Sequence, residues 1–174
     1  MFSLSLVDAR RPAMPALEER VFRAVNDSPD AWRPAVRGLM QAGTFGTVPA
    51  ASAVAFLLGR RRLAARLAVG GTVAWLTAKA VKRLAGRARP SGVVTDPRLR
   101  ESISGDLGWV SGHVTVATTL AVIAAPDLPA WAAPPLATLV GVVGFGRMYV
   151  GAHLPADVVG GCGLGLMISA TLPD

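Results

Sequence analysis

Residues 131–172 read WAAPPLATLVGVVGFGRMYVGAHLPADVVGGCGLGLMISATL. Two apolar runs, 131–148 and 154–172, flank a short link that carries Arg147 and His153. A helix of about 20 mostly apolar residues crosses the hydrocarbon core of a bilayer. The stretch therefore predicts two membrane helices whose connecting link places a cation and an imidazole at one membrane surface.

The same length criterion predicts three further spans upstream, at 36–59, 63–81 and 112–125. Residues 14–26 carry apolar side chains at helical spacing with charged residues between them, which is typical of an amphipathic helix lying in the membrane interface. The expected fold is all-α: a polytopic bundle of about five transmembrane helices plus this interfacial helix. A chain of 1–174 suits one domain.

The composition agrees with membrane helices. Hydrophobic residues make up 52% of the chain and charged residues 17%, against about 25% charged residues in soluble domains. The net charge is +7, and the basic residues lie between apolar runs without aromatic residues among them. This pattern favours anionic lipid headgroups or a phosphate substrate as partners and argues against nucleic acid. Cys162 is the only cysteine, so no intrachain disulfide is expected.

The ionisable residues of interest fall at particular ends of the predicted spans. Lys82 and Arg89 follow the second span, His113 opens the third, Arg147 closes the fourth and His153 precedes the fifth. Since consecutive spans run in opposite directions, all these positions emerge on the same side of the bundle. Ionisable groups at membrane depth are costly and usually functional, so their convergence predicts a site.

The cations of this cluster suit phosphate binding. Lys82 and Arg89 are seven residues apart, so they would share a helix face until Pro90 ends the helix. Arginine binds two phosphate oxygens at once, and lysine adds a point charge. Ser111 and Gly112 precede an apolar run, where a hydroxyl and the free N–H groups of a helix N-terminus attract an anion.

The two histidines suit the chemistry of phosphoryl transfer. His153 and Asp157 are four residues apart, so the carboxylate can keep one ring nitrogen protonated while the other attacks phosphorus. His113 would then protonate the leaving oxygen and later activate water. A single histidine near a helix end is more often structural, and the joint pattern is what favours catalysis. No residues have metal-ligand spacing, so neither a metal nor another cofactor is expected.

Three ordered motifs, at 82–90, 110–113 and 146–157, resemble those of the type 2 phosphatidic acid phosphatases, which share a fold with vanadium haloperoxidases. The family carries a Lys and an Arg-Pro separated by six residues, then Pro-Ser-Gly-His, then Ser-Arg followed by five residues, a His, three residues and an Asp. Here the motifs read KRLAGRARP, VSGH and GRMYVGAHLPAD. Val110 stands where the family has Pro, and Gly146 stands where it has Ser.

The resemblance implies a role for each motif residue, within a catalytic region at 82–157. The residues that would bind phosphate are Lys82, Arg89, Ser111, Gly112 and Arg147. For the reaction, His153 would be the nucleophile, Asp157 would orient it, and His113 would be the acid and base. The short form with an amphipathic N-terminal helix resembles bacterial undecaprenyl-pyrophosphate phosphatases. The implied activity is metal-independent release of a terminal phosphate from a polyprenyl (pyro)phosphate or a phosphatidic-acid-type lipid.

The family's orientation in the cell membrane places the active site on the extracytoplasmic side. Four arginines in the loop at 60–66 agree with a cytoplasmic position for that loop. The opposite side, however, carries six others, namely Arg10, Arg11, Arg20, Arg23, Arg33 and Arg37. Two other functions remain open. One is a membrane protein that binds or transports a lipid phosphate without cleaving it, and the other is a vanadate-dependent haloperoxidase-like enzyme.

Overall fold

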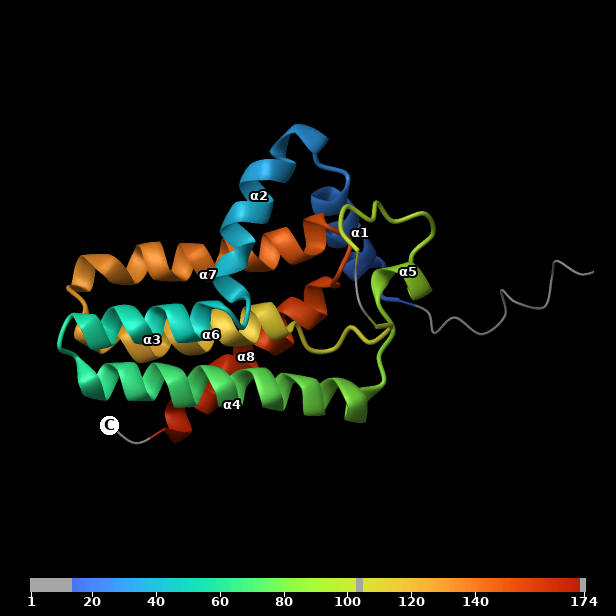
Figure 1. Ribbon diagram of the computed structural model, residues 1–174. Helices are drawn as coiled ribbons and strands as arrows, with labels where there is room; N and C mark the ends of the chain where they lie inside the picture. The colour runs from blue at the N-terminus through green and yellow to red at the C-terminus, as the bar shows by residue number, and fades with distance from the viewer. Residues whose placement is uncertain (1–13, 103–104, 173–174) are drawn as a thin grey trace, which may run out of the picture.

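The computed structural model describes residues 14–102 and 105–172, which form helices joined by loops (Figure 1). The α-helices are α1 (Ala16–Asn26), α2 (Arg33–Met40), α3 (Thr47–Leu57), α4 (Arg61–Ala85), α5 (Pro90–Val93), α6 (Gly112–Ala124), α7 (Ala133–Tyr149) and α8 (Pro155–Thr171). Short 3-10 turns lie between them, namely η2 (Asp30–Trp32), η3 (Gln41–Gly43), η4 (Ala125–Asp127) and η5 (Ala130–Ala132). The predicted all-α fold is confirmed for these residues.

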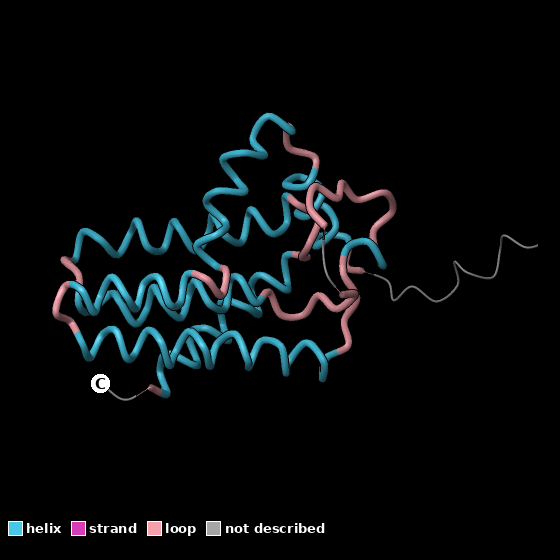
Figure 2. The backbone as a smooth tube through the Cα atoms, in the orientation of Figure 1, coloured by secondary structure: helices cyan, strands magenta, loops and turns pink. Residues whose placement is uncertain are grey.

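Helix α6 lies at the centre of the bundle and packs against α4, α7 and α8. It is apolar on nearly all sides, as expected of a helix surrounded by others. Its Val116, Leu120 and Ile123 join Leu67 of α4 and Ile168 of α8 in the largest buried cluster. The elements α1 and α5 and the long loop between α5 and α6 gather at one end of the bundle (Figure 2).

Small residues on α8 allow its close packing against α6. A Cβ atom at Gly161 would lie 2.6 Å from the backbone oxygen of Ser111. A Cβ atom at Gly165 would lie 2.7 Å from the Cβ atom of Thr118. Two glycines one helical turn apart therefore let the two backbones approach, as small residues do between membrane helices.

The predicted single span at 36–59 is wrong, because the chain breaks there into α2, η3 and α3. Thr44 has extended backbone, with φ −74° and ψ 159°. The hydroxyls of Thr44 and Thr47 both donate to the backbone oxygen of Gln41 at 2.8 Å. These local hydrogen bonds compete with helix continuation, and α2 runs steeply across the bundle from the start of α3 (Figure 1).

The other four predicted spans each coincide with one helix, namely α4, α6, α7 and α8. Within residues 14–102 and 105–172, however, no helix combines the length and the apolar character that crossing a membrane requires. The prediction of a helical bundle is thus confirmed, while the prediction of about five membrane-spanning helices is not.

The predicted amphipathic helix at 14–26 is present as α1, and its buried face packs on the protein itself. Phe22 is fully buried and contacts Val94 and Leu154. The side-chain amide of Asn26 donates to three backbone oxygens, those of Arg98, Met148 and Tyr149, at 3.0–3.2 Å. Leu17 and Val21 stay exposed on the other face. The helix is therefore fastened to the end of the bundle where α7 finishes.

We predict that Gly165→Ala destabilises the bundle by about 1–3 kcal/mol, because the added methyl group overpacks the α6–α8 contact. Thermal unfolding in detergent measures this as a lower Tm. Gly163→Ala is the matched control on the same helix, since a Cβ atom there meets nothing within 4 Å. That variant should keep or slightly raise the Tm, because alanine favours helix over glycine. Equal effects of both variants would contradict the packing interpretation.

Candidate active site

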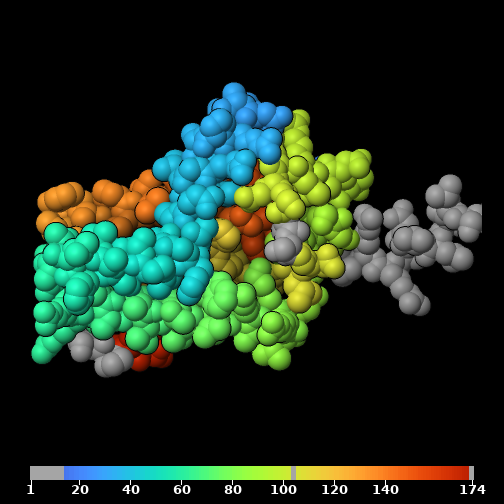
Figure 3. Space-filling model, viewed as in Figure 1, coloured from blue at the N-terminus to red at the C-terminus, as the bar shows by residue number. Residues whose placement is uncertain are grey.

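A pocket of about 450 Å³ opens at the end of the bundle where α4 and α7 finish and α6 and α8 begin. In Figure 3 the surface is hollowed between the end of α2 and the loop that follows α5. Three separate stretches of chain meet there, as the alternation of spans predicts. Six of the eight predicted site residues line the pocket, namely Lys82, Arg89, Gly112, His113, Arg147 and His153.

Lys82 lies in the last turn of α4, and its Nζ donates to the backbone oxygen of Gly108 at 3.4 Å. The pKa of Lys82 is lowered to about 8, mainly by burial and also by the positive charges of Arg89 and Arg147, while the negative charge of Asp157 partly opposes the shift. The ammonium is therefore charged at neutral pH but loses its charge in mildly alkaline solution.

Arg89 reaches the pocket from a loop, so the prediction that it shares a helix face with Lys82 is wrong. Helix α4 ends before Gly86, which adopts a left-handed backbone with φ 62°. The guanidinium of Arg89 is held by two backbone oxygens. Its Nη1 donates to Ala152 at 2.8 Å, and its Nε donates to Gly105 at 2.7 Å. These bonds fix the direction of the side chain next to the link that carries His153.

Arg147 lies in the last turn of α7 and is only 6% exposed. Its Nη1 forms an ion pair with Glu101 Oε2 at 3.1 Å and lies 4.0 Å from Met40 Sδ. In the part of the chain that the structure describes, its buried Nε has no hydrogen-bond partner. Glu101 also lines the pocket, so a carboxylate of the protein faces the cation predicted to bind phosphate.

Gly146, where the family has Ser, lies against α2. A Cβ atom there would lie 3.0 Å from the Cβ atom of Met40 and 3.2 Å from Cγ1 of Val36. A serine would force α2 outward by a few tenths of an ångström. The departure from the motif is therefore explained by packing, because α2 occupies the space that a side chain would need.

The second motif forms the N-terminus of α6. Gly112 and His113 are its first two residues and line the pocket, so the free N–H groups of this end favour an anion there. Ser111 precedes them and is fully buried outside the pocket lining. Its N–H donates to the backbone oxygen of Asp157 at 2.9 Å. Among the described residues its hydroxyl has no hydrogen-bond partner.

His153 and Asp157 meet at the start of α8, as their spacing predicts. His153 Nδ1 lies 3.4 Å from Asp157 Oδ2, which also accepts the N–H of Leu154 at 2.9 Å. Both side chains are buried. The pKa of His153 is lowered to about 3, mainly by burial and also by the positive charges of Lys82 and Arg147, although the hydrogen bond to the Asp157 carboxylate and its negative charge oppose this. The imidazole is therefore neutral at physiological pH, as a nucleophile must be.

The break between α2 and α3 closes one side of the pocket through residues that no motif indicates. A Cβ atom at Gly43 would lie 2.5 Å from the backbone oxygen of His113 and 2.8 Å from Val143 Cγ1. Only glycine allows this close approach. The neighbouring Gln41, Thr44 and Phe45 line the pocket as well.

One face of helix α4 lines the pocket, and the spacing of its residues in the sequence indicates this face. Trp75, Ala78 and Lys79 line the pocket and precede Lys82 by seven, four and three residues, the spacing of one helix face. Lys79 Nζ lies 3.5 Å from the centroid of the Trp75 ring, which packs at 4.7 Å against the ring of Phe45. This wall is apolar and aromatic with a cation beside it.

Comparison with known proteins identifies the family. Residues 50–173 match the model of the PAP2 superfamily. The chain belongs to this superfamily. The predicted resemblance to type 2 phosphatidic acid phosphatases is thereby confirmed. The residues that line the pocket lie within the matched region except for Gln41, Gly43, Thr44 and Phe45.

Similar proteins include an undecaprenyl-diphosphatase of Sulfolobus acidocaldarius, with 27% identity over 127 residues, which cover 70% of this chain and 59% of that relative. The fold resembles that of the LpxE crystal structure from Aquifex aeolicus, with a TM-score of 0.81, 19% identity and coverage of 90% and 94% of the two chains. It also resembles a transmembrane PAP2-type phosphatidylglycerolphosphate phosphatase of Bacillus subtilis, with a TM-score of 0.70, 20% identity and coverage of 89% and 82%.

We predict that the affinity of this PAP2 protein for inorganic phosphate falls as the pH rises above about 8, the pKa of Lys82. The lysine loses its charge there, so the dissociation constant should rise by up to about tenfold per pH unit if only the charged form binds. Calorimetric titration between pH 7 and 9.5 measures this. Lys82→Arg should remove the decline, because a guanidinium stays protonated. An unchanged decline in that variant would contradict the assignment.

Proposed function

We propose that this protein is an integral-membrane lipid phosphatase that forms a phosphohistidine. Its substrate is a polyprenyl (pyro)phosphate or a phosphatidic-acid-type lipid, from which it releases the terminal phosphate. One observation carries the proposal: two histidines and four cations line a single pocket, and a buried carboxylate lies beside one imidazole. Two similar proteins, an undecaprenyl-diphosphatase and a phosphatidylglycerolphosphate phosphatase, support this substrate class.

His153 is the proposed nucleophile. Asp157 lies beside its Nδ1 and keeps that nitrogen protonated, which leaves Nε2 free to attack phosphorus. A P–N bond forms as the bond from phosphorus to the lipid oxygen breaks. Charge on the equatorial phosphoryl oxygens is neutralised by Lys82, Arg89 and Arg147, while the N-terminus of α6 donates N–H groups.

His113 is the proposed acid and base. It gives its proton to the departing lipid oxygen, then takes a proton from water, which attacks the phosphohistidine. The P–N bond breaks, phosphate leaves and both imidazoles return to their starting state. The cations of the pocket provide the charge neutralisation for which other phosphoryl-transfer enzymes use Mg²⁺, so we propose a metal-independent reaction.

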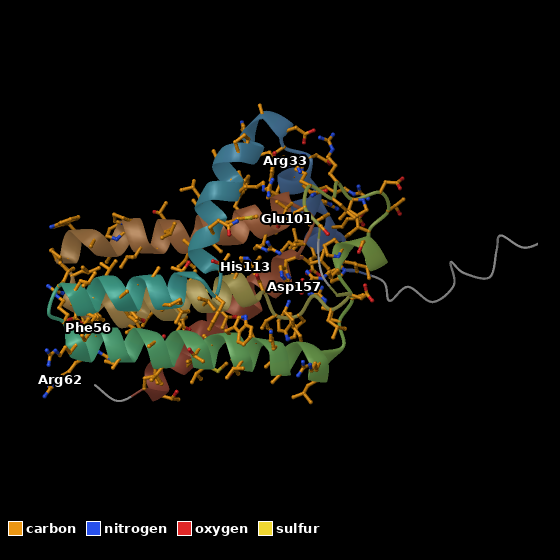
Figure 4. The ribbon with its side chains drawn as sticks, viewed as in Figure 1. Arg33, Phe56, Arg62, Glu101, His113 and Asp157 are labelled. Atoms are coloured by element: carbon orange, nitrogen blue, oxygen red, sulfur yellow. The ribbon has the colours of Figure 1, made fainter. Side chains whose placement is uncertain are left out.

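We place the protein in the cell membrane as a multi-pass protein with its site on the extracytoplasmic side. Large apolar side chains are exposed along the bundle, including Val54, Phe56, Leu57, Leu58, Val159, Leu166 and Met167. Figure 4 shows Phe56 and Arg62 at the end of the bundle opposite His113 and Asp157. Arginines in a short loop favour the cytoplasmic side, which leaves the pocket on the other side.

The test of this function is phosphate release from a panel of lipid phosphates in detergent, with and without EDTA. The wild-type protein should release phosphate in both conditions. Binding of the lipids without release would favour a binding or transport protein. Vanadate-dependent halide oxidation without phosphate release would favour a haloperoxidase-like enzyme. Loss of activity with EDTA, restored by a divalent metal, would contradict the metal-free mechanism.

We predict that His153→Ala abolishes steady-state turnover, because the substitution removes the nitrogen that is proposed to form the P–N bond. Asp157→Asn should lose less activity, because the nucleophile itself remains. Both are measured as kcat for phosphate release from the best substrate of the panel. Steady-state release by His153→Ala would remove the nucleophile assignment.

We predict that His113→Ala slows turnover in a way that depends on the leaving group. A general acid matters most when the leaving oxygen is basic, and typically contributes about 10²–10⁴-fold. The loss should therefore be large for lipid phosphates and small for an aryl phosphate such as p-nitrophenyl phosphate. An equal loss for both substrates would show that His113 is not the acid.

A further inference from the structure

Arg87 lies between two carboxylates, one of which belongs to the proposed catalytic apparatus. Its Nη1 donates to Asp157 Oδ1 at 2.8 Å. Its Nη2 donates to both oxygens of Glu18, at 2.7 and 2.9 Å. Glu18 Oε1 also accepts the N–H of Ala156 at 3.0 Å, in the first turn of α8. A chain of hydrogen bonds thus runs from α1 to the carboxylate beside the proposed nucleophile.

The bonds divide the two oxygens of Asp157 between separate tasks. Oδ2 faces His153 and accepts the N–H of Leu154, whereas Oδ1 accepts from Arg87. A carboxylate that lost its Oδ1 partner would be free to turn about its last bond and leave the imidazole. The planar guanidinium fork resists this rotation, because it holds two acceptors in fixed directions.

The network is largely removed from solvent. The side chain of Asp157 is 0% exposed, that of Glu18 10% and that of Arg87 30%. Burial by itself would lower the pKa of Arg87, but hydrogen bonds and charge from Glu18 and Asp157 outweigh it and raise the pKa. The guanidinium is therefore a permanent cation, and a buried carboxylate with such a partner stays ionised.

Neither residue has a role in the family motifs. Arg87 occupies one of the six positions that the first motif leaves unspecified between Lys82 and Arg89. Glu18 lies in α1, outside the residues that match the family model, 50–173. A helix far from the motifs in sequence is therefore linked through Arg87 to the carboxylate beside the proposed nucleophile.

We propose that Glu18 and Arg87 are positioning residues for catalysis: Arg87 holds Asp157 so that its Oδ2 faces the imidazole of His153, and Glu18 holds Arg87. Helix α1 thereby completes the active site. This inference rests on the proposed function, since it assigns the two residues to the same reaction. A purely structural ion pair that only fastens α1 to the bundle would act on stability and not through Asp157.

The experiment compares Glu18→Gln and Arg87→Lys with the wild type and with Glu19→Gln. Glu19 is the matched control on the same helix, because it forms an exposed ion pair with Arg23 at 2.8 Å away from the pocket. Steady-state kinetics of lipid phosphate release give kcat and KM separately, and thermal unfolding gives the Tm of each variant. Each substitution is also made in the Asp157→Asn background, which completes a double-mutant cycle.

Glu18→Gln and Arg87→Lys should lower kcat by about 10- to 100-fold. This is the range, about 10- to 100-fold, seen when a residue that hydrogen-bonds to a metal-binding histidine is replaced. KM should stay within about twofold, because the phosphate-binding cations are unchanged. The same substitutions should have little further effect once Asp157 is Asn, and Glu19→Gln should behave like the wild type.

Three results would overturn the inference: a wild-type kcat in Glu18→Gln, an equal loss in the Asp157→Asn background, or a lower Tm with kcat unchanged among the folded molecules. A wild-type protein that releases no phosphate would instead overturn the proposed function. The two failures are therefore distinguishable.

Discussion

The contacts of Asp157 hold the site together. Its Oδ2 accepts the N–H of Leu154, the residue before α8, and faces the imidazole of His153. Its backbone oxygen accepts the N–H of Ser111, the residue before α6, and its Oδ1 accepts from Arg87. One buried residue thus fixes the starts of two helices and the loop after α4. Burying a charge in this way is tolerable only because every oxygen has a partner.

The pocket also contains more positive charge than a protein surface would normally concentrate. Lys82, Arg89 and Arg147 lie around it, and burial lowers the pKa of Lys82 and of Arg89. Arg147 is compensated in part by Glu101 at 3.1 Å. A dianionic phosphate would neutralise the cluster more completely than one carboxylate does. Under the proposed function, the electrostatic cost of gathering these cations would be offset when phosphate binds, and this would favour phosphate over neutral ligands.

The sequence predicts the helices and the end of the bundle at which the site residues meet, because both follow from regular patterns along the chain. The lengths of the apolar runs predict four of the helices. The order of these helices along the chain, with alternating directions, predicts that His113 and His153 meet at one end of the bundle. It does not predict contacts that depend on loops. The break after η3 follows from local hydrogen bonds of Thr44, and the placement of Arg89 follows from the left-handed turn at Gly86. The Glu18–Arg87 contact joins residues 69 apart and has no periodic signal.

The N-terminal part of the chain contacts residues of all three motifs. Met40 of α2 touches Arg147, and the same helix fills the space beside Gly146. Gly43 packs on the backbone of His113, and Glu18 reaches Asp157 through Arg87. In each of these four contacts one partner precedes residue 50, where the family match begins. Elements outside the matched region therefore hold the motif residues in place. Differences among members in this N-terminal part are therefore expected to alter how the site is positioned while its reacting groups stay the same.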